Sequence, residues 1–199
     1  MGQTGGVTTT RTFVALGLPD HVRQVVAALP RRFGSESGLV WARADQAHLT
    51  LAFLGELDDE ARTRVRRRAR EVAASAAPFA ADLRGAGAFP QPQRARVLWL
   101  GWGEGSAAVE DLQARLADGL REDGIDLEAR RFHPHVTLAR ARSPRDVRAI
   151  VSALASWRSE PWQITGLDVM ASRLTPSGAL HTRLERCPLS AAGDGDVDL

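Results

Sequence analysis

The sequence predicts an α+β fold of two lobes, with mainly antiparallel sheets facing a central cleft. Two observations favour it. The pentapeptide His-x-Thr-Leu-Ala occurs twice, at 48–52 and at 135–139, in a chain of 199 residues. Strand-like segments joined in hairpins are grouped around amphipathic helical segments, which is typical of helices packed on an antiparallel sheet. Each half is therefore expected to supply one copy of the repeat to a shared cleft.

Composition sets the class of protein. Hydrophobic residues make up 44% and charged residues 25%, as in ordinary globular domains. The 26 basic residues, all Arg, nearly balance 24 acidic ones, too evenly for a nucleic-acid coat protein, and the absence of Lys and Tyr excludes catalysis by either. Cys187 alone cannot form an internal disulfide, and no apolar stretch approaches about 18 residues. We expect a cytoplasmic monomer without a membrane partner.

The first half of the chain is expected to contain two helices and three strands. The strands are predicted at 12–18, 39–43 and 48–55, and the helices at 19–29 and 56–77. Asp58 is a plausible cap for the second helix. Arginines between 62 and 70 could form a patch for an RNA backbone, but with Glu60 and Glu71 nearby they more simply form a solvated helix face.

The second half is expected to begin with a hairpin, whose strands at 79–89 and 94–102 flank a proline-rich loop. Ser106 is predicted to cap a helix that ends at Asp123-Gly124. The second repeat then forms a strand, and 143–146 reads as a second capped helix start with Pro at its first position. A last pair of strands is predicted at 162–174 and 179–184.

These elements form one domain of two lobes, predicted over 11–190. Residues 1–10 are rich in Gly and Thr, and 191–199 are small and acidic. Both ends are expected to be flexible tails.

The repeats place chemically useful side chains together. Alternate residues of a β-strand point to the same face, so His48 lies beside Thr50 and His135 beside Thr137. Imidazole titrates near neutral pH, with an unperturbed pKa of about 6.5, so one His can act as base and its partner as acid. In-line displacement at phosphorus needs both roles, and hydroxyl donors can stabilise the charge on the phosphate oxygens.

A single His-x-Thr segment would be unremarkable, because a histidine in a strand is usually a partly buried, hydrogen-bonded residue. Two of the 5 histidines in near-identical segments favour the functional interpretation instead. His133 could pair with His135 as a metal ligand, but no carboxylate or thiol stands at ligand spacing. We expect no metal and no cofactor, and His133 is expected to line the cleft or orient its neighbour. His21 and His181 are interpreted as surface or turn residues.

The two motifs resemble the signature of the 2H phosphoesterases. More narrowly, the chain is similar to the RNA 2',3'-cyclic phosphodiesterases, also called 2'-5' RNA ligases, over about residues 11 to 190. The segments that carry this resemblance are 11–15, 48–55, 96–100 and 132–140.

The resemblance implies a bilobal, pseudo-twofold fold of duplicated β/α units with both motifs facing the central cleft. It also implies metal-independent hydrolysis of RNA or nucleoside 2',3'-cyclic phosphates to 2'-phosphomonoesters, with 2'-5' ligation as the reverse reaction. It implies that His48 is the proton donor and His135 the proton acceptor, roles that the residues alone leave interchangeable. It also implies that Arg140 assists phosphate binding. Strict alternation points Arg140 away from His135, so this role requires the strand to end or bulge near Ala139. His181 stands where the family has an aromatic residue, which bears on nucleoside preference.

Two alternatives stay open at this point. One is a non-catalytic module that binds RNA phosphates, with the 62–70 arginines as its anchor and a steep salt dependence. The other is a 2H phosphoesterase that acts on a different cyclic or 2'-5' phosphodiester.

Overall fold

The computed structural model describes residues 8–34, 38–129, 131–175 and 178–190. The expected tails lie almost wholly outside these residues, and Thr10 already belongs to the first strand. No helix in the described ranges is both long and apolar enough to cross a membrane.

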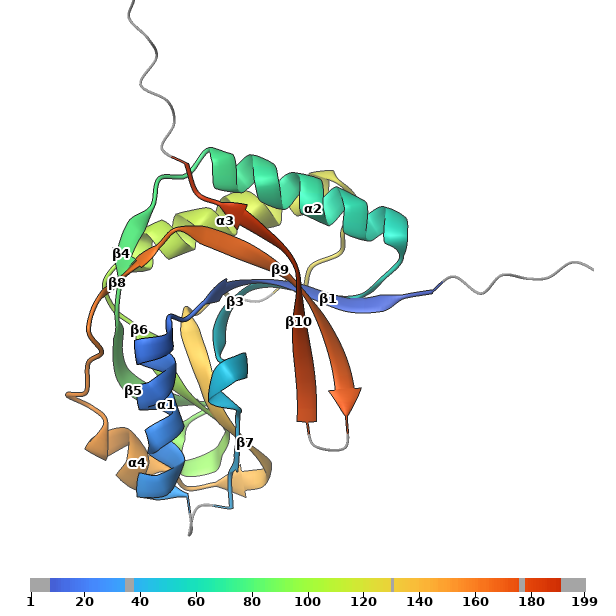
Figure 1. The fold of residues 1–199 in the computed structure, drawn as a ribbon. Coiled ribbons are helices and arrows are strands. Elements are labelled where there is room, and N and C mark those ends of the chain that lie inside the picture. The colour runs from blue at the N-terminus through green and yellow to red at the C-terminus, as the bar shows by residue number, and fades with distance from the viewer. Residues whose placement is uncertain (1–7, 35–37, 130, 176–177, 191–199) are drawn as a thin grey trace, which may run out of the picture.

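The core of the fold is an eight-stranded sheet with the order β10-β9-β1-β3-β7-β6-β5, in which β2 also pairs with β7 (Figure 1). The register pairs within it are all antiparallel, so the predicted α+β fold with a mainly antiparallel sheet is confirmed. Its strands are β1 (Thr10–Gly17), β2 (Val40–Trp41), β3 (His48–Leu57), β5 (Leu83–Phe89), β6 (Ala95–Trp102), β7 (His135–Arg145), β9 (Gly166–Thr175) and β10 (Gly178–Pro188). The two strands that carry the repeats, β3 and β7, are neighbours within the sheet.

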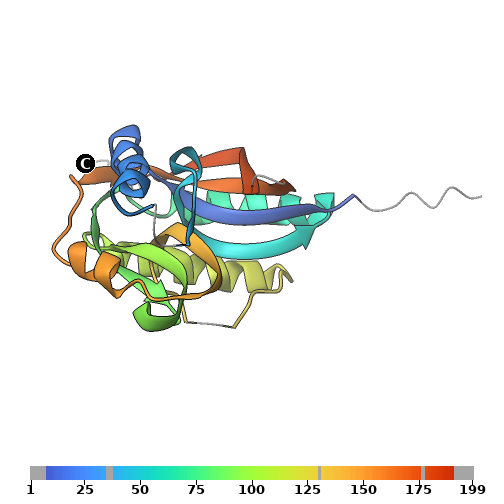
Figure 2. The same cartoon turned by 90° about the horizontal axis from the view of Figure 1, so that it is seen from below.

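Helices α2 (Asp59–Ala74) and α3 (Ser106–Glu122) lie side by side and cover the β3, β9 and β10 part of the sheet (Figures 1 and 2). Their buried faces carry Val65, Leu112, Leu116 and Leu120, as the helical spacing of these residues predicts. Asp58 caps α2, because its Oδ1 accepts a hydrogen bond from the Ala61 backbone N–H at 2.7 Å. Such a cap contributes about 1 kcal/mol to helix stability.

Shorter elements complete the fold. These are α1 (Asp20–Phe33), α4 (Arg148–Ala153), the 3₁₀ turns η1 (Ala44–Gln46) and η2 (Pro92–Arg94), and a two-stranded sheet of β4 (Phe79–Ala81) and β8 (Trp162–Ile164). The predicted strand 79–89 is therefore broken at Asp82. This fully buried carboxylate accepts hydrogen bonds from the Glu104 N–H at 2.6 Å and from Arg158 Nε at 2.7 Å. The predicted strand 162–174 is likewise divided, into β8 and β9.

One predicted helix cap and one predicted helix start are wrong. Gly105, with φ +75°, is the N-cap residue of α3, and the Ser106 hydroxyl donates back to the Gly103 carbonyl at 2.7 Å instead of capping. Residues 143–145 continue β7, since Arg145 pairs with Ala95. The helix α4 begins at Arg148, whose N–H donates to Asp146 Oδ1 at 3.1 Å.

Candidate active site

The two histidines of the repeats begin β3 and β7. These strands are antiparallel and pair Leu49 with Val136. Continuing this register by one residue in each direction places His48 opposite Thr137 and His135 opposite Thr50. Directly opposed residues share a face of the sheet. All four predicted residues therefore lie on one face, on adjacent strands at the centre of the sheet.

Each repeat contains a bulge at the same position. In the β1–β3 pair, Val14 is opposite Ala52 but Ala15 is opposite Thr50, so Leu51 is the extra residue. In the β6–β7 pair, Leu98 is opposite Ala139 but Trp99 is opposite Thr137, so Leu138 is the extra residue. A bulge re-aims the side chains that follow it.

The bulge decides where Arg140 points. Arg140 pairs with Val97, two residues from Trp99, so Arg140 shares the face of Thr137 and His135. The deviation from alternation that the sequence argument required near Ala139 is therefore present. Arg140 also comes close enough to His48 for its positive charge to lower the pKa of that imidazole.

Both imidazoles are held in the same way. His48 Nδ1 lies 2.7 Å from the Gln46 carbonyl oxygen, and His135 Nδ1 lies 2.7 Å from the His133 carbonyl oxygen. A carbonyl only accepts, so each Nδ1 carries the hydrogen and donates it. This assigns the tautomer and makes Nε2 the nitrogen that can exchange a proton with a ligand.

The surroundings of His48 are crowded and largely dry. Its ring centroid lies 4.8 Å from that of Phe13 and 5.2 Å from that of His181. Burial lowers the pKa of His48 to about 4, and the nearby His181, Arg140 and His135 add to the effect, against the stabilising hydrogen bond to Gln46. His48 is therefore neutral at pH 7 in the unliganded protein.

The interpretation of His181 as a surface or turn residue is wrong. His181 lies within β10, and its backbone N–H donates to Gln46 Oε1 at 2.6 Å. Its ring packs edge-on against Phe13, with centroids 4.9 Å apart. Burial lowers the pKa of His181 as well, with the charge of Arg11 contributing.

The surroundings of His135 are aromatic and more open. The Phe89 ring centroid lies 5.1 Å from that of His135, and the Trp99 centroid lies 6.1 Å away. His133 is exposed, with its ring 4.8 Å from that of Trp99. His133 thus orients its neighbour through its backbone carbonyl, while its side chain joins the aromatic group.

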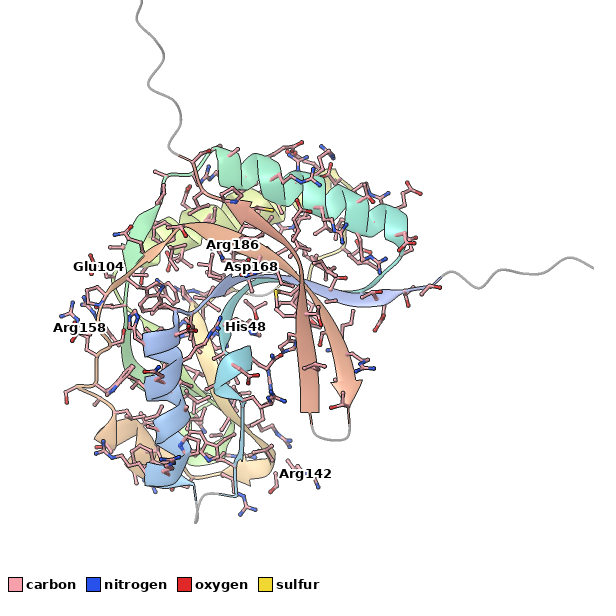
Figure 3. The ribbon with its side chains drawn as sticks, in the orientation of Figure 1. His48, Glu104, Arg142, Arg158, Asp168 and Arg186 are labelled. Carbon is pink, nitrogen blue, oxygen red and sulfur yellow. The ribbon has the colours of Figure 1, made fainter. Side chains whose placement is uncertain are left out.

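A hollow of about 200 Å³ opens beside His48. Ala15 and Gly17 of β1 line it, together with Asp168 of β9, which is labelled with His48 in Figure 3. Burial raises the pKa of the Asp168 carboxyl, and the arginines Arg186 and Arg183 oppose this. A sequence pattern gives no signal for Asp168, because its position depends on how β9 pairs with β1.

Within the described ranges, no group of three or more His, Cys, Asp or Glu side chains is arranged to hold a metal ion.

The sequence model of the 2'-5' RNA ligase superfamily matches residues 18–175. The chain belongs to this superfamily. It is 33% identical over 190 residues to an RNA 2',3'-cyclic phosphodiesterase of Thermus thermophilus, covering 90% of each chain. It is 32% identical over 178 residues to one of Archaeoglobus fulgidus, covering 87% of this chain and 97% of the relative.

Solved structures give the same result for this member of the 2'-5' RNA ligase superfamily. A crystal structure from Thermus thermophilus superposes with a TM-score of 0.78 at 29% identity, covering 92% of this chain and 100% of the other. E. coli LigT complexed with 3'-AMP superposes with a TM-score of 0.75 at 26% identity, covering 92% and 99%.

The arginines of α2, which are the expected anchor of the alternative RNA-binding module, are paired with carboxylates. Each lies within ion-pair distance of a carboxylate of this chain; the pairs are Arg62–Asp59, Arg64–Glu60, Arg66–Glu185, Arg67–Asp123, Arg68–Asp123 and Arg70–Glu185. The helix also covers the sheet away from the two histidines. Neutralised charges attract a polyanion weakly, so these arginines give little support to a non-catalytic RNA module.

Proposed function

We propose that this protein hydrolyses the 2',3'-cyclic phosphate at an RNA end, or of a nucleoside, to a 2'-phosphomonoester. One observation carries the proposal. Two imidazoles, each of whose Nδ1–H groups donates a hydrogen bond to a backbone carbonyl oxygen, share one face of the sheet with two threonine hydroxyls. The printed names of the relatives support it. The two halves of the sheet, centred on β3 and β7, form the two lobes, and the substrate occupies a cleft over their junction.

The reaction proceeds by in-line attack of water on phosphorus. His135 Nε2 accepts a proton from the water as its oxygen bonds to phosphorus. The bond from phosphorus to the 3'-oxygen breaks, and protonated His48 donates its Nε2 proton to that oxygen. Each transfer contributes about 10²- to 10⁴-fold in rate. The product carries a 2'-phosphate and a 3'-hydroxyl. Ligation through a 2'-5' linkage is the same ring opening with a ribose 5'-hydroxyl in place of water as the nucleophile, and it again leaves a 3'-hydroxyl.

The proton-donor role of His48 depends on the substrate. With a pKa of about 4, His48 is neutral at pH 7 before the substrate binds. The negative charge of a cyclic phosphate beside the imidazole favours the protonated form and raises this pKa. Substrate binding therefore favours the protonated form of His48, which is the form that can donate a proton. The reverse assignment, with His48 as base, is the competing mechanism that the low pKa favours.

The remaining residues bind the phosphate. Thr50 and Thr137 lie beside the two imidazoles and donate hydrogen bonds to the non-bridging oxygens. Arg140 lies on the same face and neutralises the charge with its fork of donors.

The decisive experiment replaces each histidine in turn. We expect His48→Ala and His135→Ala to lower kcat for 2',3'-cyclic AMP by about 10²- to 10⁴-fold, while the circular dichroism spectrum stays unchanged. His21→Ala is the matched control on α1. Activity should survive excess chelator, and the product should be the 2'-phosphate. Full activity in either active-site variant contradicts the two-histidine mechanism.

A second substrate tests the direction of proton transfer. A cyclic phosphorothiolate with sulfur at the 3' bridging position has a leaving group that needs no proton donor. We expect this substrate to restore turnover by His48→Ala but not by His135→Ala. The opposite pattern assigns the base to His48.

A further inference from the structure

A second group of arginines lies at the far end of β6 and β7. Exposed side chains gather there on η2, β6 and β7, which we call the β7 arginine surface; they are Arg94, Arg96, Arg142 and Arg145. Arg142 is labelled in Figure 3, where its side chain points away from the ribbon into solvent.

The backbone brings these residues together. Arg145 pairs with Ala95, whereas Arg140 pairs with Val97, so the β7 residues between Arg140 and Arg145 face Arg96 alone. This part of β7 must therefore loop outward from the sheet. Arg96 Nη1 donates to the Arg142 carbonyl oxygen at 3.2 Å, which ties the two strands together at this point.

The β7 arginine surface is not neutralised. Among the described residues, none of its members lies within ion-pair distance of a carboxylate, unlike the arginines of α2. The nearest acid along the chain, Asp146, is bound by Arg148 at 2.6 Å. Because charges without partners set the local potential, this end of β7 is strongly positive.

The surface continues from the proposed phosphate site. Arg140 faces the two histidines, and Arg142 follows two residues later on the same strand. Arg142 lies further along β7 from His135 than Arg140 does, so the two arginines begin a positive track that leads away from His135. If the end of a polyanion is bound at the histidines, its next charged groups would contact these arginines.

We infer that the β7 arginine surface binds the phosphodiester backbone of a single-stranded RNA, on the 5' side of the cyclic phosphate. Guanidinium groups match phosphate oxygens through paired hydrogen bonds. The inference rests on the proposed function, because the histidines define where the RNA ends. It makes an RNA chain, and not a mononucleotide, the better substrate.

The test compares two substrates and two double variants. Arg94→Glu/Arg142→Glu reverses two charges whose side chains make no described ion pair. The control, Arg64→Glu/Arg121→Glu, changes the net charge by the same amount on helices α2 and α3. Each of these arginines forms an exposed ion pair, whose loss costs little stability. The substrates are 2',3'-cyclic AMP and an RNA decamer with a 2',3'-cyclic phosphate end.

We expect the first double variant to lower kcat/KM for the decamer by on the order of tenfold, with cyclic AMP hydrolysis unchanged. The slope of log(kcat/KM) against log[salt] for the decamer should become shallower by about 1.4, at roughly 0.7 per phosphate contact on a single strand. The control variant should keep the wild-type slope. Equal losses in both variants, or an equal loss on both substrates, overturn the inference.

Direct binding separates this inference from the proposed function. The affinity for a fluorescent decamer ending in a 3'-phosphate is measured by anisotropy, which needs no turnover. Weaker binding by Arg94→Glu/Arg142→Glu than by the control supports the surface even if neither substrate is hydrolysed. Equal binding by both variants and wild type refutes it, whatever the activity.

Discussion

The two halves of the active site share a backbone and differ in their neighbours. Both contain the His-x-Thr segment, the bulge after Thr, and an Nδ1 hydrogen bond to the carbonyl two residues earlier. At equivalent positions, however, Ala15 is opposite Thr50 whereas Trp99 is opposite Thr137. The small side chain of Ala15 leaves a hollow beside His48. The large side chain of Trp99 forms an aromatic wall beside His135.

The second residue after the bulge differs as well. Phe53 occupies in β3 the place that Arg140 occupies in β7. Phe53 packs under the Arg11 guanidinium at 4.7 Å, while Arg140 turns its charge toward the histidines. The repeat thus fixes where each imidazole stands, and its neighbours decide how readily that imidazole holds a proton.

Removing the hydroxyl groups of Thr50 and Thr137 is the strongest test of whether the two halves of the site bind the phosphate in the same way. Thr50→Val and Thr137→Val keep the shape of the side chain and delete the donor, so each should lower kcat for 2',3'-cyclic AMP by about 10²- to 10³-fold. Thr63→Val on α2, whose hydroxyl only donates to the Asp59 carbonyl, is the control. If one threonine proves dispensable, the two halves do not bind the phosphate alike.

The buried environment of His48 predicts a pH-dependent stability. Its pKa falls from 6.5 unfolded to about 4 folded, so between these values the unfolded state binds more protons. The contribution is present above pH 6.5 and is lost as the pH falls toward 4, by about 3 kcal/mol. Urea unfolding at pH 7.5 and 4.5 measures it. We expect the loss of unfolding free energy between pH 7.5 and 4.5 to be smaller in His48→Gln than in His21→Gln. An identical pH dependence in both variants would show that burial does not change the pKa of His48.

The smallest expected effect concerns the aromatic wall. A Cβ at Gly87 would stand 2.2 Å from the Trp99 ring, so Gly87→Ala must displace that ring from His133 and His135. We expect kcat to fall by about tenfold, because active sites tolerate little misplacement. In the other half of the site, a Cβ at Gly17, which is opposite His48, meets Asp168 Oδ2 at 3.3 Å, and Gly17→Ala should cost less. Nuclear magnetic resonance should find the His48 pKa unchanged in Gly87→Ala. A changed His48 pKa in this variant would show that the two halves of the site are coupled.

Much of the fold and part of the candidate site could be predicted because they depend on local patterns. Strand periodicity identified the two repeat strands, and alternation grouped His48 with Thr50 and His135 with Thr137. The same rule showed that Arg140 needs a bulge, and the register supplies one. Predictions failed where a backbone group found a distant partner. Residues 143–145 of the helix start expected at 143–146 instead extend β7, because Arg145 pairs with Ala95.

The sequence by itself determined the family, the two repeats and the face that each repeat presents, because these follow from strand periodicity and motif spacing. Tertiary structure alone decided what surrounds each imidazole. His181 and Asp168 reach the His48 side through the pairing of β10, β9 and β1, and Trp99 reaches His135 through β6. It also decided which arginines are neutralised, because ion pairs such as Arg70–Glu185 join residues far apart in the chain. Register and long-range pairing set these contacts, and no local pattern encodes them.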